Sequence, residues 1–224
     1  MKIGFVIADD NEYVPVIENA EKYGCKKVIR RNRESVEFNI EKHEIIAVKC
    51  GIGKVNAASA AAFLIADDNV DAIINFGLSG AVSGLLKGDI VAGTSFTECD
   101  FDISPLGLPV GVKPQDVYVY EADGAMVKAA LSIAGVKSAK CGCGDFFLSD
   151  REKKDFYKET FGINEFDMET GAIASVCHDA DIPFAAIRQI SDDADDAASE
   201  SYKEMNDKCE DSLIDVVIQI VKNL

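Results

Sequence analysis

The stretch KVNAASAAAFLIADDNVDAIINFGLSG, residues 54–80, decides the fold class of this chain. Its first half, residues 54–66, is rich in alanine and predicts a helix that packs closely on a sheet. Residues 70–76 form a short apolar run that predicts a buried strand, and this strand ends in the loop Gly77-Leu-Ser-Gly80. A helix next to a buried strand is the building unit of an α/β protein.

The alternation of strands and helices continues on both sides of this stretch. Residues 1–8 and 184–190 are expected to be buried strands, and residues 11–23 and 169–179 are expected to be helices. One apolar stripe at helical spacing predicts a terminal helix on the sheet, formed by Leu213, Val216, Val217, Ile220, Val221 and Leu224. The sequence therefore predicts an α/β fold, one domain over residues 1–224, whose central mixed, largely parallel sheet is flanked by helices in three layers.

The charge of the chain argues against a nucleic-acid partner. The 23 Lys and Arg residues stand against 39 Asp and Glu residues, which gives a net charge of −16 over 224 residues. Binding to phosphate backbones needs a basic face, and the only basic cluster is Lys26-Lys27 with Arg30-Arg31. A small neutral or cationic substrate is compatible with this charge.

The seven cysteines have no spacing typical of a zinc site, so we expect no metal. Cys141 and Cys143, the one close pair, would share a face of a strand, and we expect two buried thiols there. Free thiols favour a reducing compartment. The chain opens on a strand-like segment and contains no apolar run long enough for a membrane span, so we expect a cytoplasmic protein without membrane contact.

Unusual residues cluster where predicted strands end. In α/β sheets, ligands bind beyond the carboxyl ends of the strands. Four such ends carry carboxylates or glycines, namely Asp9-Asp10 with Glu12, the loop 77–80, Met168-Glu169 and Ser191-Asp192. Residues 100–116, which hold three of the five prolines, predict a long loop of the kind that covers sites in such folds. The convergence predicts a ligand site at this edge of the sheet.

Several single features allow more than one interpretation. Gly51-Ile-Gly53-Lys54 lacks the spacing of a phosphate loop or a dinucleotide fingerprint, which favours a tight turn between a strand and a helix. Glu169 suits either a functional site or the N-terminal cap of the following helix. Arg188 interrupts a buried strand and needs an anionic partner, for which Glu12 and Glu169 are candidates.

Imidazole chemistry is not favoured, because His43 and His178 are the only histidines and both sit in positions typical of structural residues. If the protein is an enzyme, carboxylates must therefore transfer the protons.

Taken in order along the chain, these motifs resemble the 5′-methylthioadenosine/S-adenosylhomocysteine nucleosidases of the nucleoside phosphorylase superfamily. The resemblance spans nearly the whole sequence, and its motifs are Met1-Lys-Ile-Gly4 with Glu12, Gly51-Ile-Gly-Lys-Val-Asn-Ala-Ala58, Ile74-Asn75-x-Gly77, Gly88-Asp-Ile-Val91, Met168-Glu169 with Ala172-Ile-Ala174, Ile182-Pro-Phe184, Arg188 and Ile190-Ser191-Asp192-x-Ala194-Asp195. It implies hydrolysis of the N-glycosidic bond of an adenine nucleoside, with release of adenine.

The resemblance also implies the catalytic roles. Asp192 corresponds to the general acid that protonates or hydrogen-bonds purine N7, because an adenine anion is a poor leaving group. Glu12 corresponds to the residue that orients and deprotonates the attacking water. Arg188 would help to hold the water and the carboxylates.

Substrate-binding roles carry over in the same way. Glu169 would accept hydrogen bonds from the ribose hydroxyls, with Met168 against the sugar. Phe147 would stack on the base, the backbone of Leu148 would read its edge, and Ser191 would support Asp192.

The chain departs from the family pattern at three places near this site. Leu78 stands where the family has a serine that contacts the water. Because it occupies that position, we count Leu78 among the expected substrate-binding residues. Asp9 replaces an apolar residue that normally lies near the ribose, and the loop 100–116 lacks the usual Gly-Gln-x-Pro segment.

Two alternatives stay open. A phosphate-dependent phosphorylase would need arginines near the first strand end and at the position of Asn75, and neither is present. A non-catalytic nucleoside-binding homologue is compatible with Leu78 and Asp9. The resemblance further implies a homodimer and no metal or organic cofactor.

Overall fold

The computed structural model describes residues 1–114, 117–208 and 212–224. The strands in this part of the chain are β1 (Lys2–Ile7), β2 (Lys26–Arg30), β3 (Arg33–Ile40), β4 (His43–Lys49), β5 (Ala72–Ala81), β6 (Ile90–Glu98), β7 (Val119–Glu121), β8 (Val136–Cys143), β9 (Glu165–Asp167) and β10 (Phe184–Asp192). The α-helices are α1 (Asp10–Lys22), α2 (Lys54–Ala66), α3 (Gly124–Leu131), α4 (Arg151–Phe161), α5 (Thr170–Asp179), α6 (Ala198–Lys208) and α7 (Ser212–Lys222).

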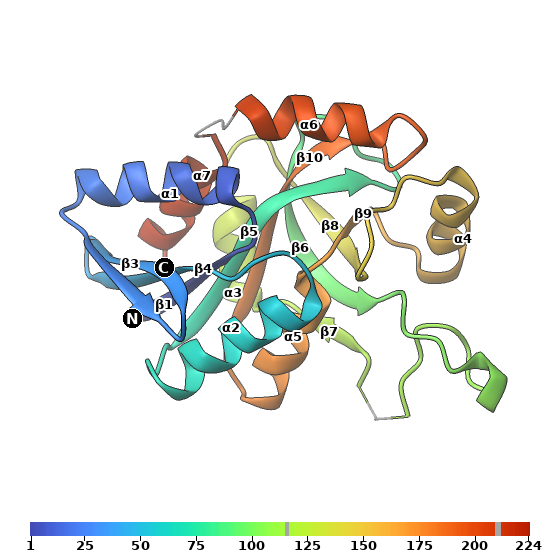
Figure 1. Ribbon diagram of the computed structural model, residues 1–224, viewed down its shortest axis with the longest axis horizontal. Helices are drawn as coiled ribbons and strands as arrows, with labels where there is room; N and C mark the ends of the chain where they lie inside the picture. Colours follow the sequence, from blue (N-terminus) through green and yellow to red (C-terminus); the bar gives the residue numbers. More distant parts are fainter. Residues whose placement is uncertain (115–116, 209–211) are drawn as a thin grey trace.

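All of these strands belong to one mixed sheet (Figure 1). Its centre is the parallel run β4-β1-β5-β10, and β3 and β2 extend it as antiparallel neighbours. On the other side, β10 pairs antiparallel with β6, and the order continues through β8 and β9 back to β5. Strand β5 pairs with β10 along one edge and with β9 through its last residues on the other edge, so β5, β10, β6, β8 and β9 close into a ring.

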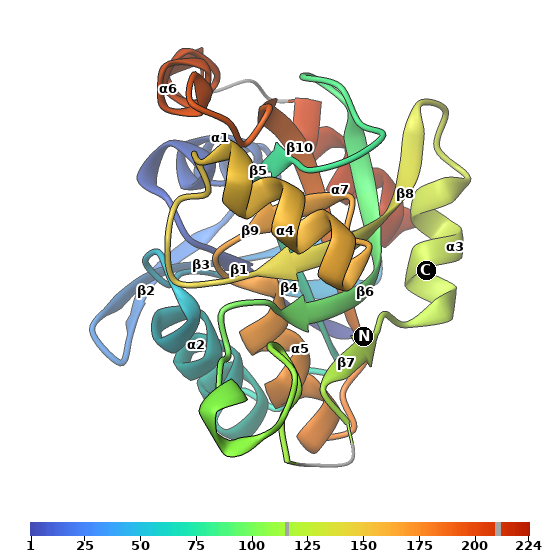
Figure 2. The same cartoon turned by 90° about the vertical axis from the view of Figure 1, so that its right-hand side faces the viewer.

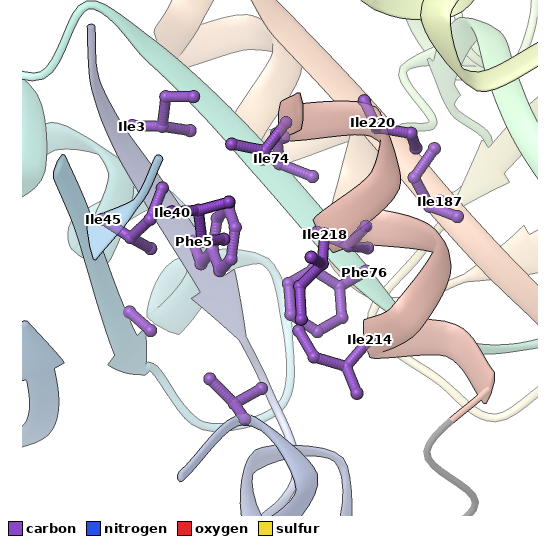
Figure 3. Close-up of a cluster of buried hydrophobic side chains, with 14 of the residues drawn as sticks. Ile3, Phe5, Ile40, Ile45, Ile74, Phe76, Ile187, Ile214, Ile218 and Ile220 are labelled. Carbon is purple, nitrogen blue, oxygen red and sulfur yellow. The ribbon is translucent and has the colours of Figure 1, made fainter. Parts of the chain in front are cut away.

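Helices cover both faces of the sheet, which confirms the predicted three layers (Figures 1 and 2). Helices α1, α3 and α7 bury their apolar faces in one core with Phe5, Ile74 and Phe76, and isoleucines of α7 lie directly against these strands (Figure 3). The alanine-rich α2 packs with α5 on the opposite face. Helix α2 approaches β1 so closely that a Cβ on Gly4 would lie 3.0 Å from the Leu64 side chain. Helix α4 packs on a third, smaller core.

Most predicted elements are present with bounds that differ by a few residues. The described part of the predicted loop, residues 100–114, holds one short 3₁₀ turn at Ser104–Leu106, and residues 115–116 lie outside the described residues. Cys141 and Cys143 are free and buried, as predicted, whereas Cys209 lies outside the described residues. No helix was predicted over residues 198–208, where the structure has α6. In Figure 1 this helix lies across the carboxyl end of β10.

Candidate active site

A cavity of about 320 Å³ opens where β1, β5 and β10 end. Its walls come from these strand ends, from the segment after β8, from the β9–α5 junction and from α6. They comprise Ala8, Asp9, Glu12, Ile52, Leu78, Ser79, Gly80, Phe146, Phe147, Leu148, Phe166, Asp167, Met168, Glu169, Ser191, Asp192 and Tyr202. The predicted site residues Glu12, Leu78, Phe147, Leu148, Met168, Glu169, Ser191 and Asp192 all line it. Arg188 lies behind the wall and is 1% exposed.

Two glycines at the end of β5 make room for two of the carboxylates. A Cβ on Gly77 would lie 2.5 Å from Glu12 Oε1, and a Cβ on Gly80 would lie 2.9 Å from Asp192 Oδ1. Neither glycine has a positive φ, so close approach and not backbone conformation excludes a larger residue. The predicted loop at residues 77–80 is wrong, because these residues continue β5 and pair with β10, a contact between distant segments that local sequence does not reveal. This part of β5 brings the carboxylates from β10 and from α1 close together.

Glu12 lies in the first turn of α1 and is held from two sides. The backbone N–H of Leu78 donates to Glu12 Oε1 at 2.8 Å, and the N–H of Asp9 donates to Oε2 at 3.3 Å. Burial raises the pKa of Glu12, the hydrogen bond from Leu78 and the charge of Arg188 oppose this rise, and the charge of Asp9 adds to it. A raised pKa makes this carboxylate a stronger base than an exposed glutamate.

Asp192 ends β10 and is 2% exposed. Its Oδ1 accepts the N–H of Ala194 at 2.8 Å, and its Oδ2 lies 2.7 Å from Ser191 Oγ. Burial raises the pKa of Asp192, while the hydrogen bonds from Ser191 and Ala194 lower it. Burial is the larger effect, so the pKa of Asp192 lies above its ordinary value.

Ser191 can serve both protonation states of Asp192. Its hydroxyl also lies 3.2 Å from the carbonyl oxygen of Ser79, but it has only one proton to donate. When Asp192 is ionised, Ser191 donates to it. When Asp192 is protonated, its carboxyl can donate to Ser191, which then donates to Ser79.

Glu169 does not cap the helix that follows it. Asp167 does this instead, because its Oδ1 accepts the N–H groups of Glu169 at 2.7 Å and Thr170 at 2.8 Å. Glu169 Oε1 accepts the N–H of Gly53 at 3.0 Å, in the tight turn that the sequence predicted between β4 and α2. Burial raises the pKa of Glu169, and Arg188 opposes this. The capping interpretation of Glu169 is therefore wrong, and its carboxylate faces the cavity.

Arg188 interacts with Asp167 and Glu169 from its buried position behind the cavity wall. Its Nε donates to Asp167 Oδ2 at 3.3 Å, its Nη2 lies 3.7 Å from Glu169 Oε2, and Nη2 also donates to Asn75 Oδ1. Of the two partners expected from the sequence, Glu169 is in ion-pair range, whereas Glu12 interacts with Arg188 only through its charge. Asp167 was missed, because a carboxylate two residues before another gives no separate signal in the sequence.

Glu165, on β9, is a further carboxyl group beneath the cavity. It is fully buried, and among the described residues neither of its oxygens makes a hydrogen bond of normal geometry; the nearby Ser79 hydroxyl is also unpaired. Burial, reinforced by the charge of Asp167, raises the pKa of Glu165 to about 8, against the opposing charge of Arg188. The group is therefore largely protonated at neutral pH.

Apolar and aromatic side chains form the rest of the wall. Phe147 is 40% exposed, and its ring meets the Tyr202 ring of α6 edge-on with 5.5 Å between centroids. Leu148 is buried and Met168 is half-buried in the same wall. Tyr202 was missed because α6 carries no strand end, glycine loop or carboxylate motif that points to a site.

The two histidines lie away from the cavity. His43 is buried at the start of β4, at the opposite end of the strand from the site, and His178 is exposed near the end of α5. No group of three or more His, Cys, Asp or Glu side chains in the described ranges could hold a metal ion. Nor does any helix within those ranges have the length and apolar character needed to cross a membrane.

Comparisons with known proteins identify the family. The model of the phosphorylase superfamily matches residues 2–222. The 5′-methylthioadenosine/S-adenosylhomocysteine nucleosidase of Halalkalibacterium halodurans is 34% identical over 230 residues, covering 100% of this chain and 99% of the relative. This chain belongs to that nucleosidase family. The family places it among enzymes that hydrolyse adenine nucleosides.

Solved structures of nucleosidases share the fold over the whole chain. The Neisseria meningitidis 5′-methylthioadenosine/S-adenosylhomocysteine nucleosidase in complex with methylthio-immucillin-A has a TM-score of 0.91 and 31% identity, and the match covers 100% of this chain and 99% of that one. A Helicobacter pylori nucleosidase mutant with 5′-methylthioadenosine in the active site gives 0.93 and 25%, with the same coverage. The recognition made from sequence motifs is confirmed, as are the fold class and the assignment as a nucleosidase.

Proposed function

We propose that this protein hydrolyses the N-glycosidic bond of 5′-methylthioadenosine, S-adenosylhomocysteine or both, and releases adenine. The observation that carries the proposal is the placement of Glu12, Glu169 and Asp192 around one mostly apolar cavity, each from a different part of the fold. The family assignment supports an adenine nucleoside as the substrate, and the relatives named for these two nucleosides match along their full length.

In the proposed reaction, the bond between ribose C1′ and adenine N9 breaks and its electron pair leaves with the base. Asp192 donates a proton to N7, so adenine departs as a neutral molecule. Its raised pKa supports this role, because the acid must hold its proton near neutrality. Ser191 keeps a hydrogen-bond partner before and after the transfer.

Water adds to C1′ as the base leaves, and Glu12 takes its proton. Two backbone N–H groups fix the orientation of the Glu12 carboxylate, and its raised pKa makes it a stronger base than an exposed glutamate. Leu78 replaces a serine side chain here, but its backbone N–H still binds Glu12. We therefore assign water activation to Glu12 alone among the side chains of this wall.

The remaining residues would bind and orient the nucleoside. Glu169 would accept the ribose hydroxyls, and Arg188 would position Glu169 from behind without touching the substrate. Met168 would lie against the sugar. Phe147 would stack on the base, and the backbone of Leu148 would contact its edge.

Phosphate is a poor co-substrate for this cavity. Phosphorolysis would bring a dianion next to Asp9, Glu12, Glu169 and Asp192, and no Lys or Arg side chain of the described residues lines the wall. Asn75, at the position where the phosphorylase branch has an arginine, binds Arg188 and the carbonyl oxygen of Val6. These contacts favour hydrolysis over phosphorolysis.

We also propose a homodimer. Val55, at the start of α2, is 78% exposed and Leu106, in the loop after β6, is 81% exposed. Lys54 Nζ contacts Asp100 Oδ1 at 2.6 Å, so the start of α2 adjoins the start of this loop. We assign these two exposed side chains to the proposed interface, and sedimentation equilibrium would give the oligomeric state.

Adenine release tests the proposed reaction directly. Release of the free base is measured for 5′-methylthioadenosine, S-adenosylhomocysteine and adenosine, which give adenine, and for inosine, which gives hypoxanthine, each with and without phosphate. We expect adenine release without phosphate, fastest for a 5′-thio nucleoside. Release that depends on phosphate would make the protein a phosphorylase. A nucleoside that raises the melting temperature but is never cleaved would make it a binding protein.

A further inference from the structure

The charged side chains that line the cavity all have the same sign. They are Asp9, Glu12, Asp167, Glu169 and Asp192, and the described wall contains no Lys, Arg or His side chain. Arg188, directly behind the wall, lies within ion-pair range of Asp167 and Glu169. Asp9, Glu12 and Asp192 have no such partner among the described residues.

Asp9 differs from the other four carboxylates. Glu12, Glu169 and Asp192 have assigned chemical roles, and Asp167 caps α5 and binds Arg188. Asp9 is half-buried at the rim, where its charge adds to the negative field within the cavity. The sequence has an acidic residue here where the family has an apolar one.

The order of the strands gives the direction in which a nucleoside would lie. Along the site, the sheet runs β10, β5, β1 and β4. Asp192 is at the β10 end, Leu78 follows on β5, and Asp9 and Ile52 follow the ends of β1 and β4. With the base at Asp192 and the ribose at Glu169, the 5′ substituent extends toward Asp9 and Ile52, because C1′ and C4′ lie on opposite sides of the ring oxygen.

We propose that this end of the cavity selects nucleosides by the charge of the 5′ substituent, and that Asp9 sets the selection. Neutral and positively charged chains are accepted, and chains that end in a carboxylate are disfavoured. The orientation in this inference rests on the proposed function, while the one-sided charge of the wall does not.

Asp9 also has a structural role that an experiment must separate from its charge. Its side chain caps α1 by accepting the N–H of Asn11 at 2.8 Å, and Glu12 closes the capping box. Asparagine is about as good an N-cap as aspartate, because capping needs only an acceptor oxygen. Asp9→Asn therefore keeps the cap and removes the charge.

Binding of three uncleavable ligands tests the charge selection without turnover. The ligands are 9-deazaadenosine derivatives, whose base is joined to ribose by a carbon–carbon bond, with 5′-butylthio, 5′-(3-aminopropylthio) or 5′-(2-carboxyethylthio) chains. Calorimetry gives the Kd of each for the wild type, for Asp9→Asn and for the control Asp10→Asn. Asp10 is an exposed neighbour that pairs with Lys49 and does not line the cavity.

In the wild type we expect the amino ligand to bind about fivefold tighter, and the carboxylate ligand about fivefold weaker, than the butyl ligand. In Asp9→Asn the ratio between the two charged ligands should fall about tenfold, while the butyl ligand changes less than about twofold. Asp10→Asn should keep the wild-type order. Added salt should reduce the differences in Kd among the three ligands for the wild type, because salt screens charges that lie near the solvent.

Equal affinities of the wild type for the three ligands, or an unchanged ratio in Asp9→Asn, would overturn the inference. The adenine-release assay is read separately. Charge-ordered binding without cleavage of any natural nucleoside would leave the selection standing and refute the hydrolase. Cleavage of a natural nucleoside, together with binding that does not depend on the charge of the 5′ chain, would support the hydrolase and refute the charge selection.

Discussion

Replacing Asp192 with asparagine removes the dissociable proton from the proposed general acid and keeps its shape. The amide oxygen can still accept the N–H of Ala194, which lies 2.8 Å from Oδ1 in the wild type. The amide nitrogen can donate to Ser191 Oγ, now 2.7 Å from Oδ2, and Ser191 can then donate to the Ser79 carbonyl at 3.2 Å. All three hydrogen bonds survive the substitution.

The expected magnitudes follow from these contacts. With no hydrogen bond lost, the free energy of unfolding should change by less than about 1 kcal/mol. Loss of general acid catalysis should lower kcat by about 10²- to 10⁴-fold. Wild-type activity should fall as pH rises through the raised pKa of Asp192, because the acid must be protonated, and residual activity of the variant should lack this fall.

The assay measures adenine release at saturating 5′-methylthioadenosine across pH, together with the melting temperature with and without nucleoside. Asp193→Asn is the matched control, because Asp193 is the next residue and its side chain is exposed. A kcat within about threefold of the wild type would refute the assignment of Asp192 as the acid, given the effects typical of such groups. Loss of folding would refute the hydrogen-bond argument.

Three further substitutions test other parts of the site. Glu12→Gln should stop hydrolysis while a nucleoside still raises the melting temperature, since the amide oxygen keeps the Leu78 contact; lost binding would indicate a structural role. Arg188→Met should lower the free energy of unfolding by about 3–5 kcal/mol in urea titrations, because it leaves Asp167 as a buried, unpaired charge; a loss below about 1 kcal/mol would contradict the ion pair. Glu165→Gln should become more stable relative to the wild type as pH rises from about 5 to 8. Over this interval the Glu165 carboxyl keeps its proton in the folded protein but has lost it in the unfolded chain, so this group lowers wild-type stability as pH rises. A difference in the free energy of unfolding that does not change with pH would contradict the raised pKa.

Much of the site could be predicted from sequence because strand ends are local features. Apolar runs that stop near Asp9 and Ser191 mark the ends of β1 and β10, and parallel neighbours must place such ends at one edge. The run that stops at Gly77 marks no strand end, because β5 continues to Ala81. The identity of the family followed from the motifs at these ends. The tight turn at Gly53 could be predicted for the same reason, because its conformation depends on local residue type.

Local spacing did not predict the roles of the two carboxylates at the β9–α5 junction or the presence of Tyr202 at the cavity. Glu169 and Asp167 are two residues apart and chemically alike. The backbone of the β9–α5 junction nevertheless orients Asp167 to cap α5 and Glu169 to face the cavity. Tyr202 reaches the cavity only because α6 crosses the end of β10.

The sequence by itself determined the alternation of strands and helices, the acidic charge and the set of carboxylates available for chemistry, since these depend on residue type and local spacing. Only the tertiary structure decided the ring closure through the three-residue strand β9, because its pairing with β5 depends on packing and not on propensity. It also decided which carboxylates Arg188 binds and which are left without a cation. Burial and long-range contacts set those partners, and they exist only after the chain has folded.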